Sequence, residues 1–238
     1  CALPIFVSLA LALFVGSFTS AAVLTALARR VAPRFGLVAR PQADRYHRTI
    51  IPLGGGVAIF GTLALVFIAG AAVMRFVLAP GHFGWLGERA GFDPADFLHR
   101  SGELLVILLC ATILFGVGLW DDKRALGPFV KLVFQFVVAF LAAACADIRI
   151  EFFIESRLVT AILSAFWIVL IVNAFNFLDN MDGAAAGIAA IAGSVLLTAA
   201  VFNGQVFVSG LAIAFIGSLL GFLVFNFPPA SIFMGDAG

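Results

Sequence analysis

Seven apolar stretches, each long enough to cross a lipid bilayer, take up most of this chain. A helix needs roughly 20 apolar residues to span the hydrocarbon core. No internal repeat or soluble segment interrupts the series, so we expect a single domain covering residues 1–238. The sequence predicts an all-α, polytopic integral membrane protein with spans at about 2–28, 54–77, 104–120, 129–146, 158–176, 184–202 and 206–225.

The composition supports the membrane class. The chain is 63% hydrophobic and only 11% charged, whereas a soluble domain is about a quarter charged. The net charge of +1, without a long basic run, gives no reason to expect a nucleic-acid partner. Repeated Ala and Gly in 184–193 are typical of close helix–helix packing in lipid.

Basic residues are unevenly divided between the two sides of the predicted bundle. The loop after the first span is rich in arginine, and the third loop adds Lys123, Arg124 and Lys131. The opposite loops, 84–103 and 147–157, mix arginines with many acids. By the positive-inside rule, the first side is cytoplasmic and the N-terminus lies outside.

Aspartates gather at the helix ends on the predicted cytoplasmic side. They are Asp121, Asp122, Asp179, Asp182 and Asp236. A carboxylate at the bilayer centre costs at least about 2.5 kcal/mol, which explains acids at helix ends but not their concentration on one side. The pattern therefore predicts a polar site built from segments that are far apart in the sequence.

Such a site suits a divalent cation together with a phosphate. Mg²⁺ is commonly held by one or two carboxylates and by phosphate oxygens. Clustered acids repel one another unless cations offset them, and basic side chains on the same side can do so while binding an anionic substrate: Arg45, Arg48, Lys123, Arg124 and Lys131. Metal, phosphate and basic groups together indicate phosphoryl-group chemistry with a soluble donor.

Local patterns add three expectations. Polar residues recur every third position from Asn173 to Asp182, and Asn180 and Gly183 should end the helix in a loop that can approach a ligand. Residues 121–128 should form a turn before a new helix. The glycines at 54–56 should give a flexible start to the second span, with amides exposed to phosphate. For His47 and Lys131, a position at the membrane interface is an equal alternative.

Four blocks, in order and on one predicted side, resemble the polyprenyl-phosphate N-acetylhexosamine-1-phosphate transferases, the MraY/WecA-type enzymes. They are residues 44–56, 121–135 (DDKRALGPFVKLVFQ), 173–183 (NAFNFLDNMDG) and 225–238 (FNFPPASIFMGDAG). The resemblance implies transfer of a sugar 1-phosphate from a UDP-sugar to undecaprenyl phosphate, with release of UMP. It also implies a multi-pass protein of the bacterial inner membrane whose active site faces the cytoplasm. The resemblance leaves open whether the protein forms a homodimer.

The resemblance also implies residue roles. Asp121, Asp122 and Asp236 are the expected catalytic residues. Asp236 and Asp121 are the expected ligands of Mg²⁺, with Mn²⁺ as an alternative, and Asp121 would orient or deprotonate the acceptor phosphate. The expected substrate-binding residues are Asn176, Asp179, Asp182, Asn226, Lys131, Arg45, His47 and Phe233, the last stacking on uracil. Direct attack is preferred to a covalent aspartyl intermediate.

Several alternatives remain at this point. The LGGG and NAFNFLDNMDG segments favour the N-acetylglucosamine-phosphate branch, with the muramoyl-pentapeptide branch as the alternative. A CDP-alcohol phosphatidyltransferase and a cation-coupled transporter are the other classes considered. The sequence ends before the further helices and the His/Arg-rich loop of full-length members. We therefore expect a C-terminally truncated fragment with little turnover of its own.

Overall fold

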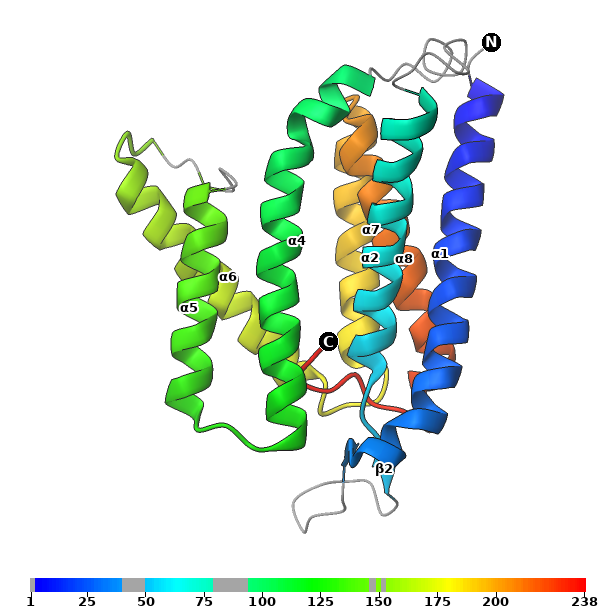
Figure 1. Ribbon diagram of the computed structural model, residues 1–238, viewed down its shortest axis with the longest axis vertical. Helices are drawn as coiled ribbons and strands as arrows, with labels where there is room; N and C mark the ends of the chain where they lie inside the picture. The colour runs from blue at the N-terminus through cyan, green and yellow to red at the C-terminus, as the bar shows by residue number, and fades with distance from the viewer. Residues whose placement is uncertain (1–2, 40–49, 79–93, 146–148, 151–152) are drawn as a thin grey trace.

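The computed structural model describes residues 3–39, 50–78, 94–145, 149–150 and 153–238. Its helices and strands, in chain order, are α1 Leu3–Val31, η1 Ala32–Phe35, β1 Val38–Ala39, β2 Ile51–Pro52, α2 Gly55–Val73, η2 Met74–Leu78, α4 Pro94–Lys123, α5 Pro128–Cys145, α6 Arg157–Leu178, α7 Ala184–Phe202 and α8 Val206–Asn226. In the described ranges, seven helices are long and apolar enough to cross a membrane. The predicted all-α, polytopic membrane class is confirmed (Figure 1).

Helix α4 differs from the prediction at both ends. It begins at Pro94, within the segment 84–103 that was predicted to be a loop. Proline suits the first turn of a helix because its missing N–H would have no intrahelical partner there. At the other end the helix continues through Lys123, so Asp121 and Asp122 lie in its last turn and not in the following turn.

Helix α8 packs closely against α1 because small residues on α8 let the backbones approach. A Cβ atom on Gly217 would lie 2.1 Å from Ser17 Oγ, and one on Gly221 would lie 2.3 Å from the Phe18 carbonyl oxygen. In lipid, helices associate mainly through such close van der Waals packing. These glycines therefore determine the α1–α8 distance.

Replacing Gly221 by alanine is expected to destabilise the bundle by about 1–3 kcal/mol, because the new methyl group overpacks against α1. The matched control is Gly210→Ala on the same helix, where the nearest atom to the new Cβ lies at 3.8 Å. Thermal unfolding of both variants in one detergent checks this. Equal melting temperatures for the two variants would contradict it.

Helix α7 supplies the alanine-rich face predicted from 184–193. Ala185, Ala186, Ala189 and Ala190 are buried in a core cluster with Phe222 of α8. The interpretation of this segment as a packing surface is confirmed. The cluster also contains Ile232 and Met234, so the bundle core extends into the segment that follows α8.

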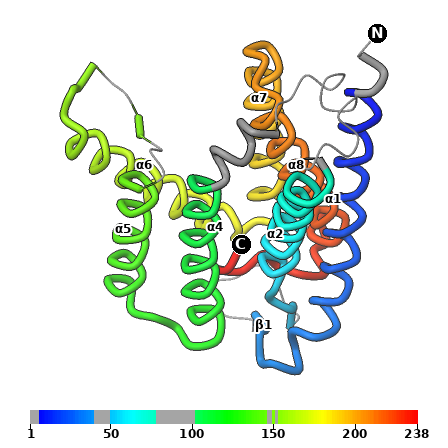
Figure 2. Tube along the Cα trace, turned by 45° about the horizontal axis from the view of Figure 1, so that its top comes forward, coloured from blue at the N-terminus to red at the C-terminus, as the bar shows by residue number. Residues whose placement is uncertain are grey.

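The C-terminal segment, residues 227–238, returns from α8 across one end of the bundle to lie between α2 and α4 (Figure 2). Its backbone joins the short β1–β2 hairpin through a parallel bridge between Leu53 and Phe233. Gly55 N–H donates to the Phe233 carbonyl at 2.9 Å, and Gly56 N–H donates to the Met234 carbonyl at 2.8 Å. The expectation that these glycine amides face phosphate is therefore wrong, because the C-terminal segment occupies them.

Candidate active site

Asp122 holds the tip of the C-terminal segment. Its two carboxylate oxygens accept the backbone N–H groups of Asp236 at 2.8 Å and Ala237 at 3.3 Å. Gly235, just before them, has φ +78°, and a Cβ there would lie 2.7 Å from Asp122 Oδ2. Only glycine fits both constraints. Asp122 thus fixes the backbone from which the Asp236 side chain projects.

Three further polar side chains hold the same segment from the end of α6 and from α8. Asp179 Oδ2 accepts Gly235 N–H at 3.1 Å, and Asp182 Oδ2 accepts Ala230 N–H at 2.9 Å. Buried Asn226 accepts the Gly183 N–H at 3.0 Å and donates to the Ile232 carbonyl at 2.9 Å. These side chains link the turn after α6 to the C-terminal segment.

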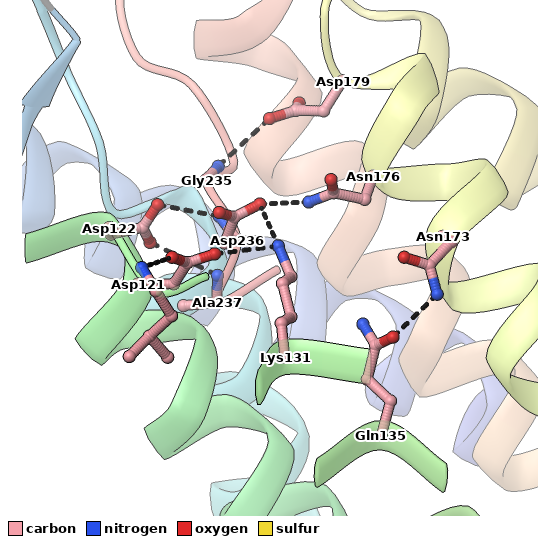
Figure 3. A network of polar contacts seen from close by, with 11 residues as sticks. Asp121, Asp122, Lys131, Gln135, Asn173, Asn176, Asp179, Gly235, Asp236 and Ala237 are labelled. Carbon is pink, nitrogen blue, oxygen red and sulfur yellow. Dashed lines mark hydrogen bonds and ion pairs between the residues drawn. The ribbon is translucent and has the colours of Figure 1, made fainter. Parts of the chain in front are cut away.

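The centre of the site is a network around Asp236 (Figure 3). Lys131 Nζ, in the first turn of α5, lies 2.9 Å from Asp236 Oδ1 and 3.0 Å from Asp121 Oδ2. Asn176 Nδ2, near the end of α6, also donates to Asp236 Oδ1. Asp121 Oδ1 accepts Leu126 N–H at 2.6 Å. Side chains from α4, α5, α6 and the C-terminal segment therefore meet at one carboxylate.

An amide pair supports this network from one turn farther along α5. Asn173 Nδ2 of α6 donates to Gln135 Oε1 at 2.7 Å (Figure 3). Gln135 is buried and lies one helical turn from Lys131. A hydrogen bond between two spanning helices resists their sliding, so this pair keeps Lys131 at the height of Asn176.

The electrostatic cost of the cluster is visible at Asp179, which follows the end of α6. Burial raises the pKa of its carboxyl, and the nearby charges of Asp122 and Asp236 add to this effect, so the pKa reaches about 7 although the Gly235 hydrogen bond lowers it. A carboxyl with this pKa exchanges its proton near neutral pH. The site therefore carries more negative charge than its surroundings readily stabilise.

The raised pKa gives a prediction for the metal-free protein. The contribution of Asp179 to stability is complete below the ordinary aspartate value of 3.8 and is lost as the pH rises toward its folded-state value of about 7. We expect the melting temperature of the wild type, minus that of Asp179→Asn, to fall between pH 4 and pH 7. Parallel curves for the two proteins over this range would contradict the assignment.

The structure brings together most of the residues singled out from the sequence. Asp121, Asp122, Lys131, Asn176, Asp179 and Asp236 form one connected cluster, with Asp182 and Asn226 at its edge. Phe233 is half-buried in the bridge to Leu53. Arg45 and His47 lie outside the described residues.

Sequence reasoning missed two supporting residues. A Cβ on Gly118 would lie 2.0 Å from the Asp236 carbonyl oxygen, so the absence of a side chain at this position of α4 lets the C-terminal segment pack against the helix. Arg29 at the end of α1 stacks over the Phe225 ring at 5.3 Å and donates to Ser231 Oγ at 3.3 Å. Gly118 lies three residues before Asp121, which is only a weak sign of a role in the site, and Arg29 belongs to the arginine-rich stretch that was used only to predict membrane orientation.

The donor set fits Mg²⁺ when a phosphate supplies further oxygens. Within the ranges that the structure describes, no three His, Cys, Asp or Glu side chains are arranged to enclose a metal ion by themselves. Asp121 and Asp236, however, already share one cation, the Lys131 ammonium. Two carboxylates completed by phosphate oxygens are a usual environment for Mg²⁺.

Comparison with known proteins decides the family. The sequence model of glycosyl transferase family 4 matches residues 104–238, which is more than half of the chain and includes every member of the cluster. The chain belongs to glycosyl transferase family 4. This membership confirms the resemblance to MraY/WecA-type enzymes and leaves the transporter and phosphatidyltransferase alternatives without support.

Individual relatives of this family 4 protein carry two kinds of name. A probable undecaprenyl-phosphate N-acetylglucosaminyl 1-phosphate transferase of Bacillus subtilis is 32% identical over 94% of this chain and 58% of its own length. A decaprenyl-phosphate N-acetylglucosaminephosphotransferase of Mycobacterium leprae is 30% identical over 90% of this chain and 54% of its own. A phospho-N-acetylmuramoyl-pentapeptide-transferase of Limosilactobacillus fermentum is 33% identical over 65% of this chain and 50% of its own. The chain thus spans little more than half the length of these relatives.

Proposed function

We propose that this chain is part of an enzyme that transfers N-acetylglucosamine 1-phosphate from UDP-N-acetylglucosamine to undecaprenyl phosphate. The reaction depends on Mg²⁺ and releases UMP. One observation carries the proposal: Asp121, Lys131, Asn176 and Asp236, from four separate segments, meet at one carboxylate inside the region matched by the family. The site would open to the cytoplasm of a bacterial cell, where the soluble donor is made.

In the proposed reaction a phosphate oxygen of the lipid attacks the β-phosphorus of the donor. The bond between that phosphorus and the oxygen of UMP breaks, and UMP leaves with the electron pair. When bound, Mg²⁺ would neutralise the diphosphate and the negative charge that develops on the leaving group. We prefer this direct attack to a covalent intermediate, because Asp236 and Asp121 would both hold the metal in this scheme.

The chain's own residues divide into two groups in this scheme. Asp236 and Asp121 would hold the metal, and Lys131 and Asn176 would orient phosphate oxygens beside it. Asp122 acts through the backbone, because both of its oxygens are taken by the amides of Asp236 and Ala237. We therefore propose that Asp122 is a positioning residue, a narrower role than the catalytic one expected from the sequence.

Exchange of labelled UMP into the UDP-sugar tests the proposal. Two proteins are compared: the 238-residue chain alone, and a chimera that continues it with the part of the Bacillus subtilis relative that the match does not reach. We expect exchange in the chimera that requires both undecaprenyl phosphate and Mg²⁺, and little exchange in the chain alone. Exchange by the chimera without undecaprenyl phosphate would contradict direct attack and favour a covalent intermediate.

The donor is tested in the same assay. UDP-N-acetylglucosamine and UDP-N-acetylmuramoyl-pentapeptide are supplied separately at equal concentrations. Exchange only with the first supports the proposal, and exchange only with the second would show the alternative function, that of the Limosilactobacillus fermentum relative. No exchange with either donor would contradict the proposed activity for this chimera.

A further inference from the structure

The Lys131 ammonium lies where a divalent cation would bind. Its Nζ atom is 3.0 Å from Asp121 Oδ2 and 2.9 Å from Asp236 Oδ1, and the three side chains expose only 18%, 10% and 29% of their surface, respectively. Two carboxylates brought this close repel each other unless a cation lies between them. Lys131 meets this need from within the chain.

We propose that Lys131 is a built-in counter-ion that competes with the metal: it holds the Asp121–Asp236 pair in the metal-free protein, and divalent cation binding displaces its ammonium from both carboxylates. The inference deepens the proposed function and rests on it only for the identity of the cation. It assigns Lys131 two positions, one between the carboxylates and one released from them.

The neighbouring contacts make this exchange physically reasonable. Asp122 is itself an acid and Asn176 is neutral, so neither can replace the ammonium as counter-ion. Lysine carries its charge on a flexible four-carbon stem, which lets the ammonium move while α5 stays fixed by Gln135 and Asn173. A divalent ion offsets both negative charges, whereas one ammonium offsets only one of them.

Chemical labelling can detect the displacement without any substrate. Lys123 and Lys131 are the lysines of this chain, and Lys123 is exposed at the end of α4, so it serves as an internal control. The purified chain is reductively methylated with and without saturating Mg²⁺, and each lysine is quantified by mass spectrometry. We expect the methylation rate of Lys131 relative to Lys123 to rise about tenfold with Mg²⁺, since two ion pairs are broken. An unchanged ratio at Mg²⁺ concentrations that saturate binding would overturn the proposal.

Metal affinity supplies a second, independent readout. Mn²⁺ binding to the purified chain is followed by the electron paramagnetic resonance signal of the free ion. Lys131→Met removes the competing charge at similar side-chain length and should tighten Mn²⁺ binding about tenfold, whereas Lys131→Arg keeps the charge and should stay within about threefold of the wild type. Asp236→Asn should abolish the saturable site.

Each outcome of the Mn²⁺ experiment decides the proposal. Unchanged or weaker binding by Lys131→Met would overturn it, as would the absence of saturable binding in both the wild type and this variant. The result is separate from the proposed transfer reaction, because no donor or acceptor is present. Tighter binding by Lys131→Met, together with no UMP exchange by the chimera, would support the counter-ion and reject the proposed activity.

Discussion

Asp236→Asn is expected to lower UMP exchange by the chimera about a thousandfold, the scale of losing a central electrostatic group at a reacting phosphate. The substitution preserves the shape of the side chain and leaves intact the backbone N–H that Asp122 accepts. What it removes is the negative charge that Lys131 contacts at 2.9 Å. The loss should therefore appear in turnover and metal binding while the fold is retained.

The control for this experiment is a carboxylate at the opposite end of α6. Glu155 is exposed and precedes Arg157, where α6 begins, whereas Asn176 and the site lie at the other end. Glu155→Gln removes the same charge and should leave exchange within about twofold of the wild type. If Asp236→Asn retained more than a tenth of wild-type exchange with an unchanged melting temperature, Asp236 would not be the central ligand.

Gly118→Ala should lower UMP exchange by the chimera about a hundredfold, because a displacement near 1 Å at a reacting centre has an effect of this size. The added methyl group would lie 2.0 Å from the Asp236 carbonyl oxygen and 2.5 Å from its carbonyl carbon. Helix α4 cannot yield easily, since Asp121 in its last turn is tied to the following loop by the Leu126 N–H. The backbone of Asp236 must move instead.

Gly116 offers a matched control two residues earlier on the same helix. It is exposed, and an added Cβ would meet nothing within 4 Å. Gly116→Ala should keep full exchange and gain about 0.5–1 kcal/mol of stability from the better helix propensity of alanine. Similar exchange rates for the two alanine variants would show that the Asp236 segment tolerates displacement.

The polar residues of the site could be predicted from the sequence, but the exact helix ends and the contacts of the C-terminal segment could not. The acids and amides at the ends of α4 and α6 could be identified from the sequence, because ionisable residues next to a membrane span are costly and usually have a function. The exact helix ends could not, and α4 extends past Asp122 because its last turn is held by the C-terminal segment. The glycines at 54–56 were misinterpreted for a similar reason: their amides pair with Phe233 and Met234, distant partners that no local pattern reveals.

The sequence by itself determined the class of protein, the seven spans found in the described ranges and the residue types of the polar site, because hydrophobic length and the cost of burying charge are local properties. Only the tertiary structure separated the acids by role. Asp122, Asp179 and Asp182 accept backbone amides of the C-terminal segment, whereas Asp121 and Asp236 share an ammonium. These roles depend on which groups lie opposite each carboxylate, and that depends on how far-apart segments pack together.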